Sequence, residues 1–190
     1  DKDAPTITSV TGNPTTWTKN DVTLTINGAK DTGSGLHATE TYSFDGGTTW
    51  QTGNTKTYTG NTTGIVIKVK DKLGNIYTHP EINIIYIDKD EPTIASVSGN
   101  PTTWTKNDVT LTVNSASDTG SGLHTTETYS FDGGATWQTS NKKIYAENTS
   151  GIVIKVKDKV GNIYTHNTIN ITYIDKGTPS ITSVTGNPTS

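Results

Sequence analysis

The sequence contains no cysteine, no methionine and no arginine, so all fifteen of its basic residues are lysines. Without cysteine the chain has no disulfide, no cysteine-ligated structural zinc and no thiol nucleophile. The formal net charge is −3 at pH 7, which is slightly acidic. Because nucleic acids and anionic membrane surfaces attract clustered positive charge, the sequence predicts neither as a partner.

Hydrophobic residues are also scarce, at 29% of the 190 residues, and long apolar runs are missing. No run approaches the roughly 20 residues that cross a bilayer as a helix, so we expect no membrane insertion. The low hydrophobic content does not predict disorder, because disorder needs high net charge and few aromatic or β-branched residues. Four Trp, eight Tyr and many Thr, Ile and Val are present. This mixture favours strands and predicts an all-β protein with thin cores.

The chain contains one sequence repeat that occurs twice in full and is followed by the beginning of a third copy. Trp17 recurs as Trp104, an offset of 87 residues that the other large side chains share. The opening phrase DKDAPTITSVTGNPTT returns with few changes at the C-terminus. Repeats of this length are domains rather than solenoid turns. We expect two domains, 1–87 and 88–174, followed at 175–190 by the first strand of a third copy in an array that continues.

Short alternating runs mark the strands inside each repeat. Val22, Leu24 and Ile26 alternate with polar residues, and the run from Ile65 to Lys70 alternates in the same way. Turn signals such as Asp45-Gly46-Gly47 separate the runs, and helical periodicity is absent. About seven short strands in each repeat are typical of an immunoglobulin-like topology. The predicted fold class is therefore all-β, with tandem immunoglobulin-like β-sandwiches of about seven strands each.

Five phrases follow one another in the same order in both repeats: D-K-D-x-P-T-I, N-P-T-x-W-T, D-T-G-S-G-L, Y-S-F-D-G-G and V-K-D-x-x-G-N-I. Their order resembles the tandem Ig-like repeats of large bacterial surface proteins and adhesins, mostly from Gram-positive bacteria. The resemblance covers essentially the whole chain. It implies an extracellular location, on the cell surface or secreted, and a structural stalk that presents a distal binding region. The partners that it implies are the neighbouring Ig-like repeats.

A second motif bears on whether the chain is an enzyme. Ser43, Asp45, Gly47, Thr49 and Trp50 fit the S-x-D-x-G-x-T-W pattern of the Asp-box, which is familiar from sialidase propellers. Two repeats of 87 residues do not make a propeller, and a sialidase site needs several arginines. We therefore interpret the motif as a hairpin device in which the Asp side chain accepts hydrogen bonds from turn amides. The sequence predicts no enzyme and no catalytic residue.

Acidic residues at one end of each expected sandwich suggest a possible cofactor, Ca²⁺. The first strand and two loops would gather carboxylates there, and Ca²⁺ takes six to eight oxygen ligands. In the second repeat the candidates are Asp88, Asp90, Glu91, Asp118 and Asp158. Their equivalents in the first repeat are Asp1, Asp3, Asp31 and Asp71. The alternative is that these residues form turns and that nearby lysines balance them, namely Lys2, Lys72, Lys89 and Lys159.

Trp17 and Trp104, which follow the Asn-Pro turns, are the candidate ligand-binding residues. If exposed, they could stack on sugar rings. The alternative is that each Trp fills one end of a thin core, where an aromatic side chain buries about 150–250 Å². The second function that we consider is accordingly a module that binds a carbohydrate or a host surface protein, in an adhesin or beside an extracellular enzyme.

Overall fold

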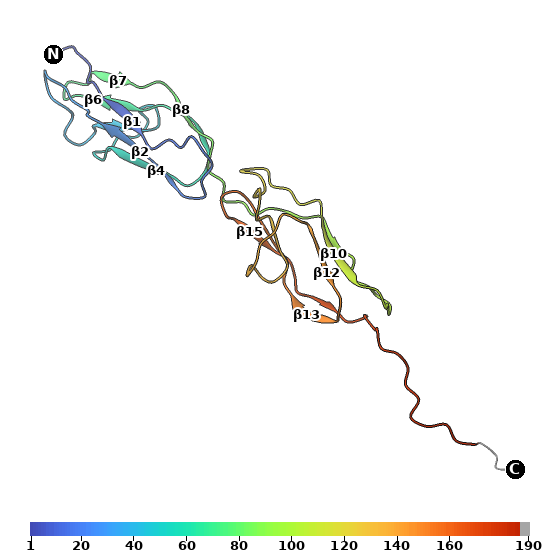
Figure 1. Ribbon diagram of the computed structural model, residues 1–190. Helices are drawn as coiled ribbons and strands as arrows, with labels where there is room; N and C mark the ends of the chain where they lie inside the picture. Colours follow the sequence, from blue (N-terminus) through green and yellow to red (C-terminus); the bar gives the residue numbers. More distant parts are fainter. Residues whose placement is uncertain (187–190) are drawn as a thin grey trace. The chain divides into compact units, whose positions relative to one another are not determined.

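The computed structural model describes residues 1–186. Over this range the chain is all-β, with sixteen strands in several antiparallel sheets and no helix (Figure 1). The all-β class predicted from the composition is therefore confirmed. Small antiparallel sheets around one buried apolar cluster are consistent with a β-sandwich.

Contacts between residues divide the chain into two compact units, and the boundaries of these units differ from those of the sequence repeats. Unit 1 comprises Asp1–Pro92, Asp118–His124 and Lys157–Ile163, and unit 2 comprises Thr93–Ser117, Thr125–Val156 and the chain from Tyr164 onward. Two loops of the second repeat thus belong to unit 1. The period of 87 residues describes the sequence, whereas the units reflect which loops lie close together.

The first repeat supplies eight strands, which form three small sheets. In chain order, β1–β8 are Ser9–Thr11, Val22–Asn27, Tyr42–Ser43, Thr55–Tyr58, Thr62–Ile65, Lys68–Lys70, Ile76–Thr78 and Ile82–Ile84. The strand orders are β1-β2-β4, β3-β6-β7 and β5-β8. Figure 1 shows β1, β2 and β4 side by side, with the six-residue β2 in the middle.

The second repeat reproduces this arrangement strand for strand. In chain order, β9–β16 are Ser96–Ser98, Val109–Asn114, Tyr129–Ser130, Lys142–Tyr145, Thr149–Ile152, Lys155–Lys157, Ile163–Thr165 and Ile169–Ile171. The strand orders are β9-β10-β12, β11-β14-β15 and β13-β16. The pairing is the same in both copies because the alternating apolar positions that set the register recur with the repeat.

The last two strands expected in each repeat are interrupted hairpin arms. The pairs Lys68↔Thr78 and Thr62↔Ile84 keep one register, which shifts at Ile65↔Ile82. Pro80 has no N–H to donate where the arm is broken. The second copy has Asn167 there and is broken as well, so proline is not the only cause. In both copies a histidine Nδ1 lies 2.7 Å from the next residue's carbonyl oxygen at this break.

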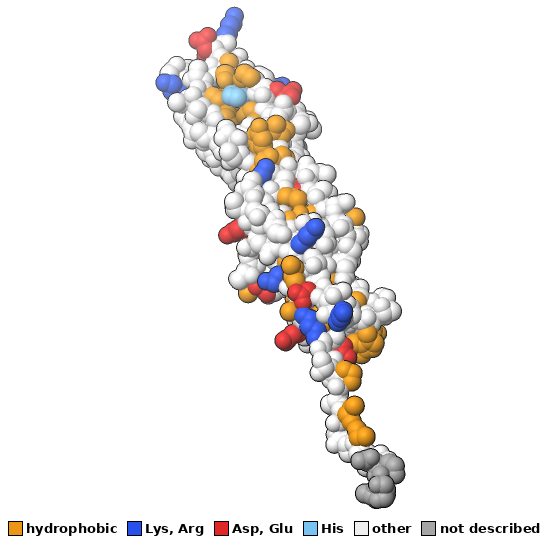
Figure 2. Space-filling view, turned by 45° about the vertical axis from the view of Figure 1, so that its right-hand side comes forward, with side chains coloured by type: hydrophobic (Ala, Val, Ile, Leu, Met, Phe, Trp, Pro, Cys, Tyr) orange, Lys and Arg blue, Asp and Glu red, His pale blue; other side chains and the backbone are white. Residues whose placement is uncertain are grey.

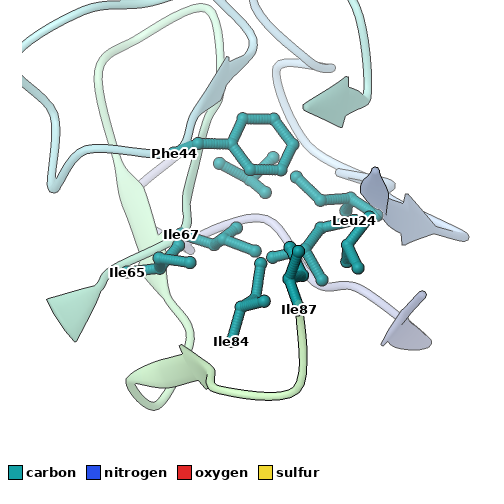
Figure 3. Packing of buried hydrophobic residues seen from close by; sticks show 9 residues of the cluster. Leu24, Phe44, Ile65, Ile67, Ile84 and Ile87 are labelled. Carbon is teal, nitrogen blue, oxygen red and sulfur yellow. The ribbon is translucent and has the colours of Figure 1, made fainter. Parts of the chain in front are cut away.

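The core of the first repeat is a single cluster of nine buried residues. Val22, Leu24 and Ile26 of β2 point inward, and the alternate threonines of the strand face outward. Figure 3 shows Leu24, Phe44, Ile65, Ile67, Ile84 and Ile87 converging on one another from different segments of the chain. The second repeat buries the equivalent residues, from Val109 through Ile174. Each repeat thus has its own thin core.

The surface is mostly uncharged. Figure 2 shows a face on which uncharged side chains and backbone predominate, with charged side chains scattered or in small groups. Asn61 and Asn148, both exposed, each bind the backbone near the end of their repeat. The Asn61 amide oxygen accepts from the N–H of Ile87 at 2.8 Å, and its Nδ2 donates to the Ile87 carbonyl at 3.0 Å. Asn148 clasps Ile174 in the same way.

The expected first strand of a third copy lies in residues 175–190. Residues 175–186 are exposed and form no strand, and residues 187–190 lie outside the described range. In the first repeat, β1 is a strand because it pairs with β2. Residues 175–186 pair with no strand within the described range.

Candidate functional site

The turn after β6 is built around a buried carboxylate. Asp71 Oδ1 accepts hydrogen bonds from the amides of Leu73 at 2.9 Å and Asn75 at 2.7 Å, and Oδ2 accepts from Asn75 Nδ2 at 2.7 Å. The side chain replaces the backbone as acceptor, as in other Asp turns. In the second repeat Asp158 holds Asn162 through the same two contacts, each at 2.7 Å. Asp71 and Asp158 are both fully buried.

A glycine-rich loop supplies two further carboxylate contacts in each repeat. In the second repeat the amide of Gly122 donates to Asp118 Oδ2 at 2.6 Å, and the amide of Ser121 donates to Asp88 Oδ2 at 2.6 Å. A Cβ at Gly120 would lie 2.4 Å from Asp88 Cγ, so this close approach requires glycine. In the first repeat the amides of Gly35 and Ser34 donate to Asp31 and Asp1, both at 2.7 Å.

These turns bring three carboxylates together in each repeat. We call Asp1, Asp31 and Asp71 the first acidic triad, and Asp88, Asp118 and Asp158 the second acidic triad. Within each triad one carboxylate oxygen from every residue lies within 4.8 Å of the others. All residues of both triads belong to unit 1. The second triad is the more buried, because Asp88 is 4% exposed whereas Asp1 is exposed.

The structure thus gathers part of the set that the sequence predicted. Asp3, Asp90 and Glu91 belong to neither triad, and all three are exposed. Asp90 is held otherwise, since its amide donates to Asp88 Oδ1 at 3.2 Å. Although Asp90 is only two residues from Asp88, proximity in sequence does not place its carboxylate in the triad.

The lysines proposed as counter-charges form no ion pair with either triad. Lys89 pairs with Asp21, and among the described residues Lys2, Lys72 and Lys159 form no ion pair at all. The Lys159 ammonium does lie near the loop, 3.3 Å from where a Cβ on Gly122 would be. Two unit negative charges 4.8 Å apart repel by about 3.5 kcal/mol at an effective dielectric constant of about 20. The second triad therefore favours either a cation or a proton.

One carboxyl group in each triad has a shifted pKa, and the two shifts have opposite directions. Burial raises the pKa of Asp118 above its ordinary value, and the negative charges of Asp88 and Asp158 raise it further, against a lowering by the Gly122 amide. Burial alone would raise the pKa of Asp71, but hydrogen bonds from Asn75, Ser34 and Leu73 outweigh it, and the pKa is lowered. A carboxylate without enough donors in a shared site holds its proton more tightly.

A serine lies next to each triad, and its hydroxyl is used differently in the two repeats. Ser34 Oγ donates to Asp71 Oδ2 at 3.0 Å and contacts Asp31 Oδ2 at 3.5 Å. Ser121, its equivalent, is 3% exposed, and its Oγ is buried without a hydrogen-bond partner. A buried hydroxyl without a partner is uncommon, because its desolvation is not compensated. The sequence reasoning did not single out Ser121, since a serine in a Gly-Ser-Gly loop carries no signal of its own.

Trp104 lies outside the core. It is 67% exposed and packs edge-on against Tyr173, with ring centroids 5.6 Å apart. Trp17 is half-buried and contacts Tyr86 in the same T-shaped geometry. The interpretation of Trp104 as a core side chain is therefore wrong, because the apolar residues of β10 and its neighbours fill the core without it. Its exposed ring is available to a ligand.

The Asp-box motif is a hairpin device, as the sequence predicted. Asp45 accepts hydrogen bonds from the amide and the hydroxyl of Thr49, at 2.9 and 2.5 Å, and from Ser43 Oγ at 2.8 Å. Trp50 Nε1 donates to the carbonyl of Gly47 at 3.1 Å. The Thr49 hydrogen bonds lower the pKa of Asp45 to about 2. The Asp45 carboxylate thus accepts its hydrogen bonds from residues of its own turn and stabilises the hairpin.

Beside this hairpin lies a cavity of about 390 Å³, and the second repeat has one of about 400 Å³ at the same place. Each is lined by a phenylalanine, the Asp-box aspartate, and a tyrosine whose buried hydroxyl has no hydrogen-bond partner, Tyr58 or Tyr145. The sequence analysis did not identify these cavities, because they lie between β4 and β5, whose approach depends on how the sheets pack.

The chain matches no family model, and no curated protein matches it either. Residues 1–186 contain no helix of the length and apolarity needed to cross a membrane.

Proposed function

We propose that this chain is a structural spacer: tandem immunoglobulin-like β-sandwiches in the stalk of a bacterial surface protein or adhesin, outside the cell. The observation that carries the proposal is the repetition itself. Two sequence copies 87 residues apart give the same eight strands, the same sheet orders and the same buried positions. A binding site or a catalyst needs one copy, whereas a spacer gains length from each additional copy.

The polar chemistry of the chain supports a mechanical role. Polar contacts that recur in both repeats, such as the Asn61 clasp and the Asp45 hairpin, are directed at backbone groups of the same repeat. They tie turns and chain ends to the strands, which resists local opening. The proposal includes no catalytic step.

Single-molecule force spectroscopy tests the spacer proposal. Pulled from its two ends, the chain should show two unfolding events of similar force. Each should release roughly 300 Å of contour, because about 87 residues extend by about 3.3–3.6 Å each. A chain that extends without a resolved event, or in one event only, would contradict two independent load-bearing domains.

A second function, carbohydrate binding, is favoured by one observation, the exposed Trp104 against Tyr173. An exposed aromatic face stacks on the apolar face of a sugar ring. Titration with glycans should then quench Trp fluorescence in the parent chain but not in Trp104→Ala. Equal quenching in Trp104→Ala would assign the signal to another tryptophan and remove this candidate.

A further inference from the structure

We propose that an exposed face of unit 2 docks the loop end of another copy of this repeat. The Trp104 face, as we call it, consists of Trp104, Lys106, Tyr173 and Ile174. The loop end consists of residues 31–36 and 71–75, and in solution a second copy of the chain supplies it. The inference deepens the spacer proposal, on which it rests, because it names the surfaces through which one repeat would hold the next.

The first repeat carries the equivalent of this face, and within unit 1 that surface binds loops of the second repeat. Lys19 Nζ donates a hydrogen bond to the carbonyl oxygen of Gly161 at 3.4 Å. Asn162 Nδ2 donates to the carbonyl oxygen of Asp88, the residue that follows the first repeat, at 3.1 Å. One end of the repeat thus already binds the loop end of another copy.

The aromatic pair of the Trp104 face is more exposed than its equivalent in unit 1. Trp104 is 67% exposed and Tyr173 is 37% exposed, whereas Trp17 and Tyr86 are half-buried. The two pairs have the same edge-on geometry, with ring centroids 5.6 Å apart in both. The tyrosine partner therefore does not account for the difference. The difference fits a surface that is covered in unit 1 and uncovered in unit 2.

Two further features make the Trp104 face suitable for docking. Lys106, the equivalent of Lys19, has no hydrogen-bond or ion-pair partner among residues 1–186. A hollow of about 290 Å³ includes Ile174 in its wall, and Ile174 bridges Thr105, the residue between Trp104 and Lys106. The face thus combines exposed aromatic rings, an ammonium group and a hollow, as interfaces anchored by Trp and Tyr do.

The complementary surface is exposed at the loop end of the first repeat. Leu73 is 63% exposed, whereas its equivalent, Val160, is half-buried. Gly74 is also exposed, and its equivalent is the glycine whose carbonyl accepts from Lys19. The contact seen within unit 1 therefore predicts that Lys106 of one copy meets Gly74 of another.

The proposed contact is head-to-tail, because one copy uses the Trp104 face and the other uses its loop end. Residues 175–186, which follow the face, are exposed and form no strand, so no paired element has to be displaced. A contact between unlike ends repeats from copy to copy, as neighbour contacts do in repeat proteins. We expect association between separate chains to be weak, since a single aromatic pair anchors it.

Chemical cross-linking of the full chain tests the contact, and the lack of cysteine makes the labelling specific. A Lys106→Cys chain is mixed with an equal amount of a ¹⁵N-labelled Leu73→Cys chain and a short bismaleimide. Cross-linked products accumulate even when the contact is weak, and mass spectrometry separates mixed dimers from dimers of one variant. Mixed dimers should exceed their statistical share severalfold. A statistical mixture would overturn the proposal.

Ile144→Cys is the matched control for Leu73→Cys. Both side chains are 63% exposed, but Ile144 lies on β12, outside the loop end. Mixed with the Lys106→Cys chain, it should give mixed dimers at the statistical share only. A yield equal to that of Leu73→Cys would mean that the cross-links record random collisions, and the docking surface would be rejected.

Trp104→Ala, added to the Lys106→Cys chain, tests the aromatic anchor. The yield of mixed dimers with Leu73→Cys should fall toward that of the control mixture, because truncation of an anchoring Trp costs much of the binding energy. The melting temperature should stay close to that of the parent, since the ring lies outside the core. An undiminished yield would overturn the assignment of this face.

The two proposals fail separately, because the force measurement uses single chains. Two unfolding events without specific cross-linking would reject the docking surface and leave the spacer proposal. Specific cross-linking in a chain that shows no resolved unfolding event would reject the spacer proposal and leave the contact.

Discussion

The amide of Ser121 donates a hydrogen bond to Asp88 Oδ2 at 2.6 Å, joining residues 33 positions apart, and the same bond joins Ser34 to Asp1 at 2.7 Å. In both repeats this bond fastens the beginning of the repeat to its glycine-rich loop. The two copies differ in the serine hydroxyl next to the bond, which is used in the first repeat and unused in the second. Four predictions follow from this and from other local contacts.

Ser34→Ala and Ser121→Ala should differ in their effect on stability. Ser34→Ala removes a hydrogen bond to the buried Asp71 and should lower the free energy of unfolding by about 1–2 kcal/mol. Ser121→Ala removes a hydroxyl without a partner and should change it by less than about 0.5 kcal/mol. Urea unfolding measures both. Equal losses would mean that the two hydroxyls have equivalent partners.

Gly120→Ala should destabilise the chain through a steric clash. The added Cβ would lie 2.4 Å from Asp88 Cγ, so the carboxylate must move away from the Ser121 amide. We expect a loss of about 1–3 kcal/mol in urea unfolding, as for other overpacked sites. Gly60→Ala is the control, because a Cβ there meets no atom within 4 Å. Similar losses at both positions would point to backbone flexibility rather than to this contact.

Protonation of Asp45 and Asp132 should make the chain less stable in acid. Hydrogen bonds from Thr49 and Thr136 lower the folded-state pKa of each to about 2, from an ordinary value of 3.8. A lowered pKa contributes stability that is full above about pH 5 and is lost as pH falls toward 2. Asp45→Asn combined with Asp132→Asn should therefore lower stability at pH 7, by an amount that shrinks at pH 2–3.

Urea unfolding of the double variant and the parent at several pH values measures this difference. Asp90→Asn serves as the control for a change in net charge at an exposed position. A stability difference that stays constant from pH 7 to pH 2 would contradict the role assigned to the two carboxylates.

Asn61→Ala should remove the clasp on the backbone of Ile87. Two half-buried hydrogen bonds, at 2.8 and 3.0 Å, are lost, and two backbone groups remain without partners. We expect the free energy of unfolding to fall by about 1–3 kcal/mol. Asn13→Ala, which removes one exposed hydrogen bond to Asn83, should cost less than about 1 kcal/mol. Chemical denaturation compares the two, and an equal cost would argue against the clasp.

Features that depend on a few neighbouring residues were the easiest to predict from the sequence. The alternation of Val22, Leu24 and Ile26 indicated the inward face of β2, and Asp45-Gly46-Gly47 indicated the hairpin, because these patterns act within a few residues. The sequence was less informative where two strands meet. The register shift between the pairs Thr62↔Ile84 and Ile65↔Ile82 depends on how β5 and β8 meet, which neither strand reveals alone.

The candidate site shows the same division. Asp31 and Asp71 were identified with Asp88, Asp118 and Asp158 because turns after strands gather at one end of a sandwich. Asp90 and Glu91 were included for the same reason, but their carboxylates do not belong to the second acidic triad. Ser121 was not identified, since a hydroxyl becomes informative only when its partners, or their absence, are known.

The sequence by itself determined the class of structure and its duplication. The chain lacks Cys and Arg, and its β-branched residues alternate with polar residues along short strands. The same pattern recurs after 87 residues, so each of the two repeats forms strands around a thin core. Only the tertiary structure decided which carboxylates meet, that the second triad lies wholly within unit 1, and that Trp104 is exposed. These outcomes depend on distances between loops far apart in the chain. Such distances are set by how sheets pack and not by the local preferences that a sequence displays.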